Sequence, residues 1–301
     1  MSDINGIINI YKEKGCTSHD VVMKVRKALN IKKVGHAGTL DPDAEGVLTI
    51  CIGKATKAIE YMTEKDKEYV ATVKLGIATD TQDITGKVID EHEVPKLDEC
   101  DLENTINKFT LGYEQVPPMY SAIKINGRKL YELAREGKEV EREARSVYIT
   151  EIELTKIITN DEFEIRVSCS KGTYIRTLCH DIGKVIGCGA CMKTLIRTRV
   201  GKFTLEDCIK IDQLTDNNIL SEKLIIVENI FENYGKIYIN EASEKTLLNG
   251  GKLYLKNIQN NDIIKENTIY RIYDANNEFV ALYRCIYENN ENVLKVEKMM
   301  R

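Results

Sequence analysis

The sequence has few histidines, no long hydrophobic run and no signal-peptide pattern, and each absence argues against a class of protein. Only His19, His36, His92 and His180 occur among the 301 residues, and none belongs to a Ser/His/Asp order, so hydrolase chemistry has little support. No apolar stretch approaches the roughly 18 residues of a membrane span, and no charged segment followed by an apolar one opens the chain. We therefore expect a cytoplasmic protein without membrane association.

The sequence also lacks a complete metal-binding pattern. Nine cysteines, an odd number scattered along the chain, favour free thiols over a disulfide framework. Cys188 and Cys191 have the spacing of half a zinc site, but no second Cys or His pair could supply the other ligands. The acidic stretch 41–45 is spaced like the start of a calcium loop, yet Ile52 stands where an EF-hand requires a carboxylate. We expect no metal site.

The charge of the chain is unevenly distributed. The formal net charge is −4, whereas residues 166–202 contain eight lysines and arginines against one aspartate, a charge of +7. A basic segment inside an acidic protein is the pattern expected of a phosphate-binding surface. A solvated basic face is the alternative that charge alone leaves open.

Strand-like and helical patterns follow one another without strict βαβ order, which predicts an α+β fold with a mixed, largely antiparallel sheet. The expected strands are 6–10, 47–52, 69–75, 120–125, 147–154 and 163–169, and the expected helices are 17–29, 56–62, 97–109, 130–134 and 175–185. A composition shift near residue 233 predicts two domains, 1–232 and 233–301. The second should be small and β-rich, with a short helix at 241–248 and strands near 254, 270–273, 279–286 and 293–296.

Residues 35–46, GHAGTLDPDAEG, stand out as a candidate active-site loop. Three glycines, a proline and three carboxylates argue against a helix or a central strand, and the apolar run that follows would anchor the loop to the sheet. Asp41 is its most plausible chemical group, with Arg176 as a charge partner and Tyr69 as an aromatic face for a base. His36 could equally be a loop hydrogen-bonder or a substrate contact.

The stretch GHAGTLDPDAEGVL resembles the H-x-G-x-L-D-P-x-A-x-G-V-L signature of TruB-type tRNA pseudouridine synthases. The blocks KEYVATVKLGIATDTQD, VPPMYSAIKINGRKLYELAREG, SKGTYIRTL and LIRTRVGKF resemble further family blocks in the family's order. Two departures are Glu13, where the family usually has proline, and Ile196, where an arginine is common. Ile196 removes one potential phosphate contact.

The resemblance implies a bacterial, stand-alone enzyme that isomerises uridine 55 of the tRNA T-loop to pseudouridine, without metal or organic cofactor. It implies a monomer that needs no protein partner, and a C-terminal domain of the RNA-binding PUA type. A non-enzymatic tRNA-binding module and a guide-RNA-dependent relative are the alternatives.

The resemblance also assigns roles to residues. Asp41 would be catalytic, as a nucleophile or as a base that assists a glycal-type intermediate, and His36 would take up the space left by the extruded base. The substrate-binding residues would be His36, Tyr69, Tyr174, Arg176 and Leu195. The expected RNA contacts are Lys124, Arg128, Lys129, Lys171, Lys193, Arg197 and Arg199.

Overall fold

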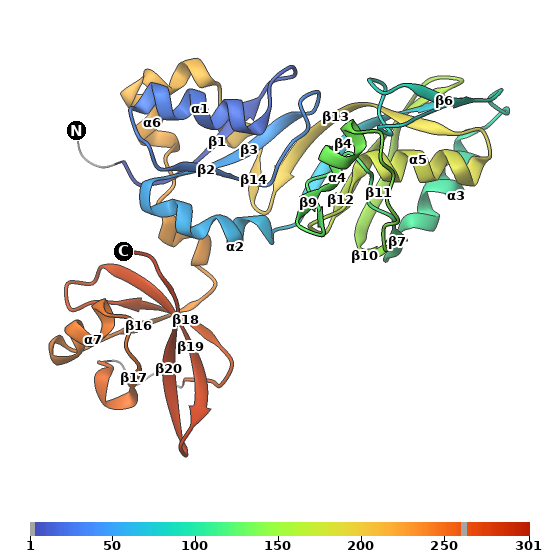
Figure 1. Ribbon diagram of the computed structural model, residues 1–301. Coiled ribbons are helices and arrows are strands. Elements are labelled where there is room, and N and C mark those ends of the chain that lie inside the picture. Colours follow the sequence, from blue (N-terminus) through green and yellow to red (C-terminus); the bar gives the residue numbers. More distant parts are fainter. Residues whose placement is uncertain (1–3, 260–263) are drawn as a thin grey trace.

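The computed structural model describes residues 4–259 and 264–301, and its larger part is built on one mixed β-sheet (Figure 1). The strand order is β11-β12-β4-β13-β3-β1-β15, with β2 paired to β3 and β14 paired to β13. These strands are β1 (Gly6–Lys12), β2 (Val34–Ala37), β3 (Glu45–Ile52), β4 (Lys67–Leu75), β11 (Ile149–Thr159), β12 (Glu162–Cys169), β13 (Ala190–Val200), β14 (Phe203–Thr204) and β15 (Cys208–Ile209).

Most neighbours in this sheet are antiparallel, and only the pairs β3–β13 and β1–β15 are parallel among the described strands. The expected α+β class with a mixed, largely antiparallel sheet is therefore confirmed. Central strand β13 lies between β4 and β3 and joins the two halves of the sheet.

Helix α1 (Ser18–Leu29) covers the first half of the sheet. It begins with a capping box in which Thr17 accepts from the Asp20 amide and Asp20 accepts in return, as the Thr-Ser start predicts. Its buried face, with Val21 and Val25, packs against sheet residues such as Ile8 and Ile50. The helix thus fixes the edge from which the 38–44 loop leaves the sheet.

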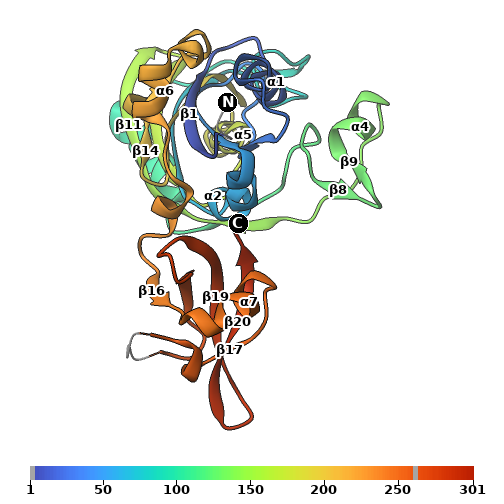
Figure 2. The same ribbon diagram turned by 90° about the vertical axis from the view of Figure 1, so that its left-hand side faces the viewer.

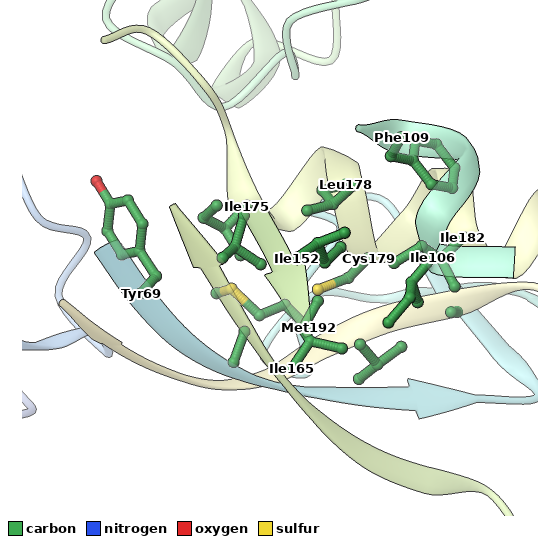
Figure 3. Close-up of a cluster of buried hydrophobic side chains, with 14 of the residues drawn as sticks. Tyr69, Ile106, Phe109, Ile152, Ile165, Ile175, Leu178, Cys179, Ile182 and Met192 are labelled. Atoms are coloured by element: carbon green, nitrogen blue, oxygen red, sulfur yellow. The ribbon is translucent and has the colours of Figure 1, made fainter. Parts of the chain in front are cut away.

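Helices α5 (Ile175–Ile186) and α3 (Glu99–Ile106) cover the second half. Residues of α5 such as Leu178 and Ile182 pack with Ile165 of β12 and Ile106 of α3 in one buried cluster (Figure 3). Tyr69 of β4 lies at one end of this cluster, so the core ends where the candidate active site begins.

Two expectations for individual segments are wrong. Residues 35–37 belong to β2, whose His36 is paired with Ile50 of β3, so the irregular loop is limited to residues 38–44. Of the expected strand 120–125, only Lys124–Ile125 (β8) is extended and paired, with β9 (Arg128–Lys129). The prolines before it favour an irregular path, and that path leads to the projection formed by β8, β9 and α4 (Leu130–Arg135) (Figure 2).

Shorter elements connect these layers. They are the 3₁₀ segment η1 (Gly53–Ala58), α2 (Ile59–Thr63), β5 (Ile77–Thr79), β6 (Val88–Glu91), β7 (Tyr113–Gln115), β10 (Arg145–Val147) and α6 (Asn217–Lys223). Strand β5 pairs with β6, and β7 pairs with β10. Within the described residues, the helices are too short or too polar to cross a bilayer.

A second, smaller sheet follows in the order β16-β18-β19-β20-β17, as the β-rich composition predicts. Its strands are β16 (Gly235–Tyr238), β17 (Leu253–Tyr254), β18 (Ile269–Tyr273), β19 (Phe279–Glu288) and β20 (Glu291–Met299), and the short helix α7 (Glu244–Leu248) lies between β16 and β17. Ala58 and Phe231 pack with Leu282 and Met300 of this part, and the Tyr61 ring meets Phe231 edge-on at 5.0 Å. The smaller sheet therefore contacts the larger part through an apolar joint. Figure 1 shows the smaller sheet below the larger part.

Candidate active site

A cleft of about 700 Å³ opens where the 38–44 loop, the start of β4, the start of α5 and the segment 120–122 meet. Five of the residues expected to act on the substrate line it: Asp41, Tyr69, Tyr174, Arg176 and Leu195. They come from four separate stretches of the chain, so the fold brings them together.

His36 is not among the described residues that line this cleft. It lies half-buried on β2, where burial, followed by the charge of Arg197, lowers the pKa of its imidazole. A lowered pKa keeps the ring neutral near pH 7.

Two buried polar side chains anchor the 38–44 loop. The Lys12 ammonium donates to the carbonyls of Ala44 (2.6 Å) and Pro42 (3.0 Å). The Ser18 hydroxyl donates to the Leu40 carbonyl (3.0 Å) and accepts from the Leu40 amide (2.9 Å). Because both ends of the loop are tied to rigid elements, Asp41 between them is held in a defined position.

Arg197 is a third anchor of this loop, and its expected role as a phosphate contact is not supported by its placement. Only 1% of the residue is exposed, and its guanidinium donates to the carbonyls of Val47 (2.8 Å), Gly38 (3.1 Å) and Thr39 (3.3 Å). A guanidinium that is buried and bonded to three carbonyls of the loop does not reach a phosphate at the surface.

Gly46 lies where the loop rejoins the sheet, and it has no room for a side chain. Its φ of +106° is unfavourable for other residues, and an added Cβ would lie 2.2 Å from the Arg197 carbonyl oxygen. We expect Gly46→Ala to lower the free energy of unfolding by about 3 kcal/mol, through backbone strain and this clash.

The matched control is Gly137→Ala, since Gly137 has φ +72° but nothing within 4 Å of its added Cβ. Backbone strain alone should lower the free energy of unfolding of Gly137→Ala by about 1 kcal/mol. Urea denaturation of both variants measures the difference, and equal losses would contradict the role of the close approach.

Asp41 and Arg176 form an asymmetric ion pair in the cleft. The Arg176 Nε lies 3.0 Å from Asp41 Oδ2, and its Nη2 lies 3.5 Å from Oδ1. The Asp41 side chain is 42% exposed, whereas that of Arg176 is only 6% exposed. The carboxylate can therefore meet a substrate while the guanidinium behind it stays in place.

Further contacts of Arg176 identify a residue that the sequence reasoning missed. Its Nη1 donates to the Thr81 carbonyl (3.0 Å) and lies 3.4 Å from the Asp83 carboxylate, and its Nη2 donates to the Tyr120 carbonyl (2.9 Å). Asp83 ends the block KEYVATVKLGIATDTQD, but it was assigned no role from the sequence. An acidic residue in such a block was the signal available.

Two of the tyrosines that line the cleft, Tyr69 and Tyr174, are protonated phenols at neutral pH. Burial raises the pKa of Tyr69, which is 9% exposed, and burial likewise raises the pKa of Tyr174. Tyr69 is thus suited to stacking, and a phenol whose pKa is raised by burial is a poor base at neutral pH.

Lys67 is a second cleft residue that the sequence reasoning did not single out. It is 6% exposed, and its ammonium donates to the carbonyls of Thr63 (2.6 Å) and Lys65. Burial lowers its pKa to about 8. The sequence signal that could have identified Lys67 as a cleft residue was its position two residues before Tyr69 on the same strand.

Much of the basic segment 166–202 is paired with acidic residues from elsewhere in the chain. Lys193 lies 2.7 Å from Glu162, Arg199 lies 2.6 Å from Asp66, and Lys171 pairs with Glu64. The charge of +7 counted along the sequence is therefore not a free surface charge. Exposed ion pairs of this kind contribute only about 0–1 kcal/mol to stability. These lysines and arginines can therefore leave their carboxylate partners and bind RNA phosphates instead.

The remaining expected RNA contacts lie on the projection beside the cleft. Arg128 pairs with Glu136, whereas Lys124 and Lys129 have no ion pair within the described ranges. The Lys129 ammonium lies 5.3 Å from the ring centre of Tyr131, which lines the cleft. A cation beside a partly exposed aromatic ring is suited to binding single-stranded RNA.

Solved structures share this architecture. The chain in the "Crystal Structure of a Cbf5-Nop10-Gar1 Complex" matches with a TM-score of 0.73 and 28% identity, covering 98% of this chain and 85% of that one. The "Structure of H/ACA RNP bound to a substrate RNA containing 2'-deoxyuridine" matches with a TM-score of 0.71 and 26% identity over the same shares.

Sequence comparisons give the family. Residues 26–175 match the model of the TruB family pseudouridylate synthase N-terminal domain, and residues 176–229 match that of the tRNA pseudouridylate synthase B C-terminal domain. The tRNA pseudouridine synthase B of Clostridium perfringens is 46% identical over 297 residues, 99% of each chain. That of Clostridioides difficile is 41% identical over 301 residues, 98% of this chain and 99% of that protein. The chain therefore belongs to the TruB family of pseudouridylate synthases.

Proposed function

We propose that this chain converts uridine 55 in the T-loop of tRNA to pseudouridine, with Asp41 as the catalytic group. The observation that carries the proposal is the half-exposed Asp41 carboxylate, held by the buried Arg176 in a cleft that also contains Tyr69. The curated relatives are named tRNA pseudouridine synthase B, and tRNA is the substrate class we carry over from them.

The reaction needs one carboxylate beside the ribose and no redox change. The C1′–N1 bond breaks, the uracil turns, C5 bonds to C1′, the proton on C5 is lost, and N1 gains a proton. Asp41 would act either as the nucleophile at C1′ or as the base of a glycal-type route. Arg176 supplies the compensating charge in both cases. No metal or organic cofactor takes part in either route.

The target uridine must leave its loop to reach Asp41, at a cost of a few kcal/mol. Stacking on the Tyr69 ring offsets about 1–3 kcal/mol, and contacts between RNA phosphates and exposed cations such as Lys171 and Lys193 offset more. His36 would fill the space that the extruded base leaves. Tyr174 and Leu195 line the pocket around the uracil.

We assign catalysis to residues 1–232 and a PUA-type RNA-binding role to residues 233–301. The small sheet encloses a buried cluster of its own, which supports this division, and the apolar joint at Phe231 holds it against the catalytic part. The enzyme acts as a monomer and needs neither a guide RNA nor a protein partner.

The proposal is tested with a synthetic T-stem-loop that carries tritium on C5 of the target uridine. The purified protein should release the tritium to water in the presence of a chelator, because only the isomerisation exchanges the C5–H bond for C5–C1′. Binding without release would favour a tRNA-binding module. Release that requires an added guide RNA would favour a guide-dependent enzyme.

A further inference from the structure

The segment that follows Pro118 brings an unpaired hydroxyl into the cleft. Ser121 is 5% exposed and lines the cleft, and its Oγ has no hydrogen-bond partner among the described protein atoms. Its backbone is fully engaged, since its amide donates to the Met119 carbonyl (2.9 Å) and its carbonyl accepts from the Tyr131 amide (3.1 Å). A buried hydroxyl without a partner is costly, so a substrate group that pairs with it gains binding energy.

The position of Ser121 points to the ribose side of the substrate. The carbonyl of the preceding Tyr120 accepts from the same Arg176 Nη2 that contacts Asp41, with distances of 2.9 and 3.5 Å. Ser121 is therefore tied to the Asp41–Arg176 pair, while the base is assigned to the Tyr69 ring. Asp41 has to act beside C1′, and the 2′-hydroxyl is the polar ribose group on the next carbon.

Tyr174 supports this placement. Burial raises the pKa of its phenol, and the nearby Ser121 hydroxyl opposes that effect. Both residues line the same cleft, where their hydroxyl groups can donate to and accept from a substrate. A ribose hydroxyl, which donates and accepts, matches such a pair.

We propose that the Ser121 hydroxyl hydrogen-bonds the 2′-hydroxyl of the target nucleotide and so selects a ribose over a deoxyribose beside Asp41. This inference rests on the proposed function, because it takes a flipped uridine as the occupant of the cleft. The contact positions the sugar and moves no proton in the reaction.

The test compares two T-stem-loop RNAs that differ only in the target nucleotide, uridine or 2′-deoxyuridine. Binding is measured in the Asp41→Asn background, so that neither RNA is converted. With Ser121 present, we expect uridine to bind about five- to tenfold more tightly, the value of one neutral hydrogen bond. Ser121→Ala should bring the ratio close to one by weakening only the uridine RNA. Ser121→Cys, of similar size with a weak donor, should do the same.

Ser170→Ala is the matched control, since Ser170 lines the same cleft but its hydroxyl already accepts from the Tyr148 amide (3.1 Å). This variant should keep the full ratio. Equal weakening of both RNAs by Ser121→Ala, or an unchanged ratio in both Ser121 variants, would overturn the inference. Tritium release by the wild-type protein does not depend on this binding ratio. The inference about Ser121 can therefore fail while the proposed function still holds.

Discussion

Replacement of Asp41 by asparagine is expected to reduce turnover of a T-stem-loop by at least about three orders of magnitude, while RNA affinity stays within about threefold. The amide can neither attack C1′ nor accept a proton. It occupies the same volume and can still face Arg176, whose three further oxygen partners keep it in place. The measurement combines single-turnover kinetics with equilibrium binding.

Asp43→Asn is the matched control for this experiment, because Asp43 is exposed on the same loop and is assigned no chemical role. Its turnover should remain within about twofold of wild type, since an exposed surface substitution has little effect. If the two variants lose activity equally, a general electrostatic effect of the loop explains the loss better than chemistry at Asp41.

Replacement of Arg176 by methionine is expected to damage both folding and catalysis. The guanidinium is 6% exposed, and its removal leaves the Asp83 carboxylate, 17% exposed, without its buried counter-charge. We expect the free energy of unfolding to fall by about 3 kcal/mol, which is the lower end of the loss caused by breaking a buried ion pair. The loss stays at this end because the partly exposed Asp41 carboxylate can turn to water. Turnover should fall by at least about two orders of magnitude because Asp41 loses its positioning partner.

Two comparisons make this prediction specific. Arg199→Met breaks a partly exposed pair with Asp66 and should cost less than about 1 kcal/mol. Adding Asp83→Asn to Arg176→Met should recover part of the lost stability, because it removes the uncompensated carboxylate. Denaturant unfolding provides both values. No recovery in the double variant would contradict the charge balance inferred for Arg176.

The elements that sequence reasoning predicted well are those with strong local signals. The capping residues at Thr17 and Asp98, and the alternation at 163–169, specify α1, α3 and β12 through contacts within a few residues. Residue type and context suggested Asp41, Tyr69 and Arg176 as site residues, and the resemblance then assigned them roles, because no local pattern connects their segments.

Strand β13 was missed, although it is the centre of the large sheet. Its sequence carries Lys193, Arg197 and Arg199, which obscure the alternation of a buried strand. Only the folded chain shows that Arg197 is enclosed by backbone carbonyls and that the other two meet carboxylates from β12 and from the turn before β4. Such pairings depend on contacts between segments far apart in the sequence.

The central claim is tested most directly by mapping pseudouridine at single-nucleotide resolution in an unmodified tRNA transcript. The transcript is incubated with an excess of wild-type or Asp41→Asn protein. The wild type should convert the T-loop uridine at position 55 and no other uridine, and Asp41→Asn should leave it unchanged over the same time. No conversion at position 55 by the wild type, or comparable conversion by Asp41→Asn, would contradict the account.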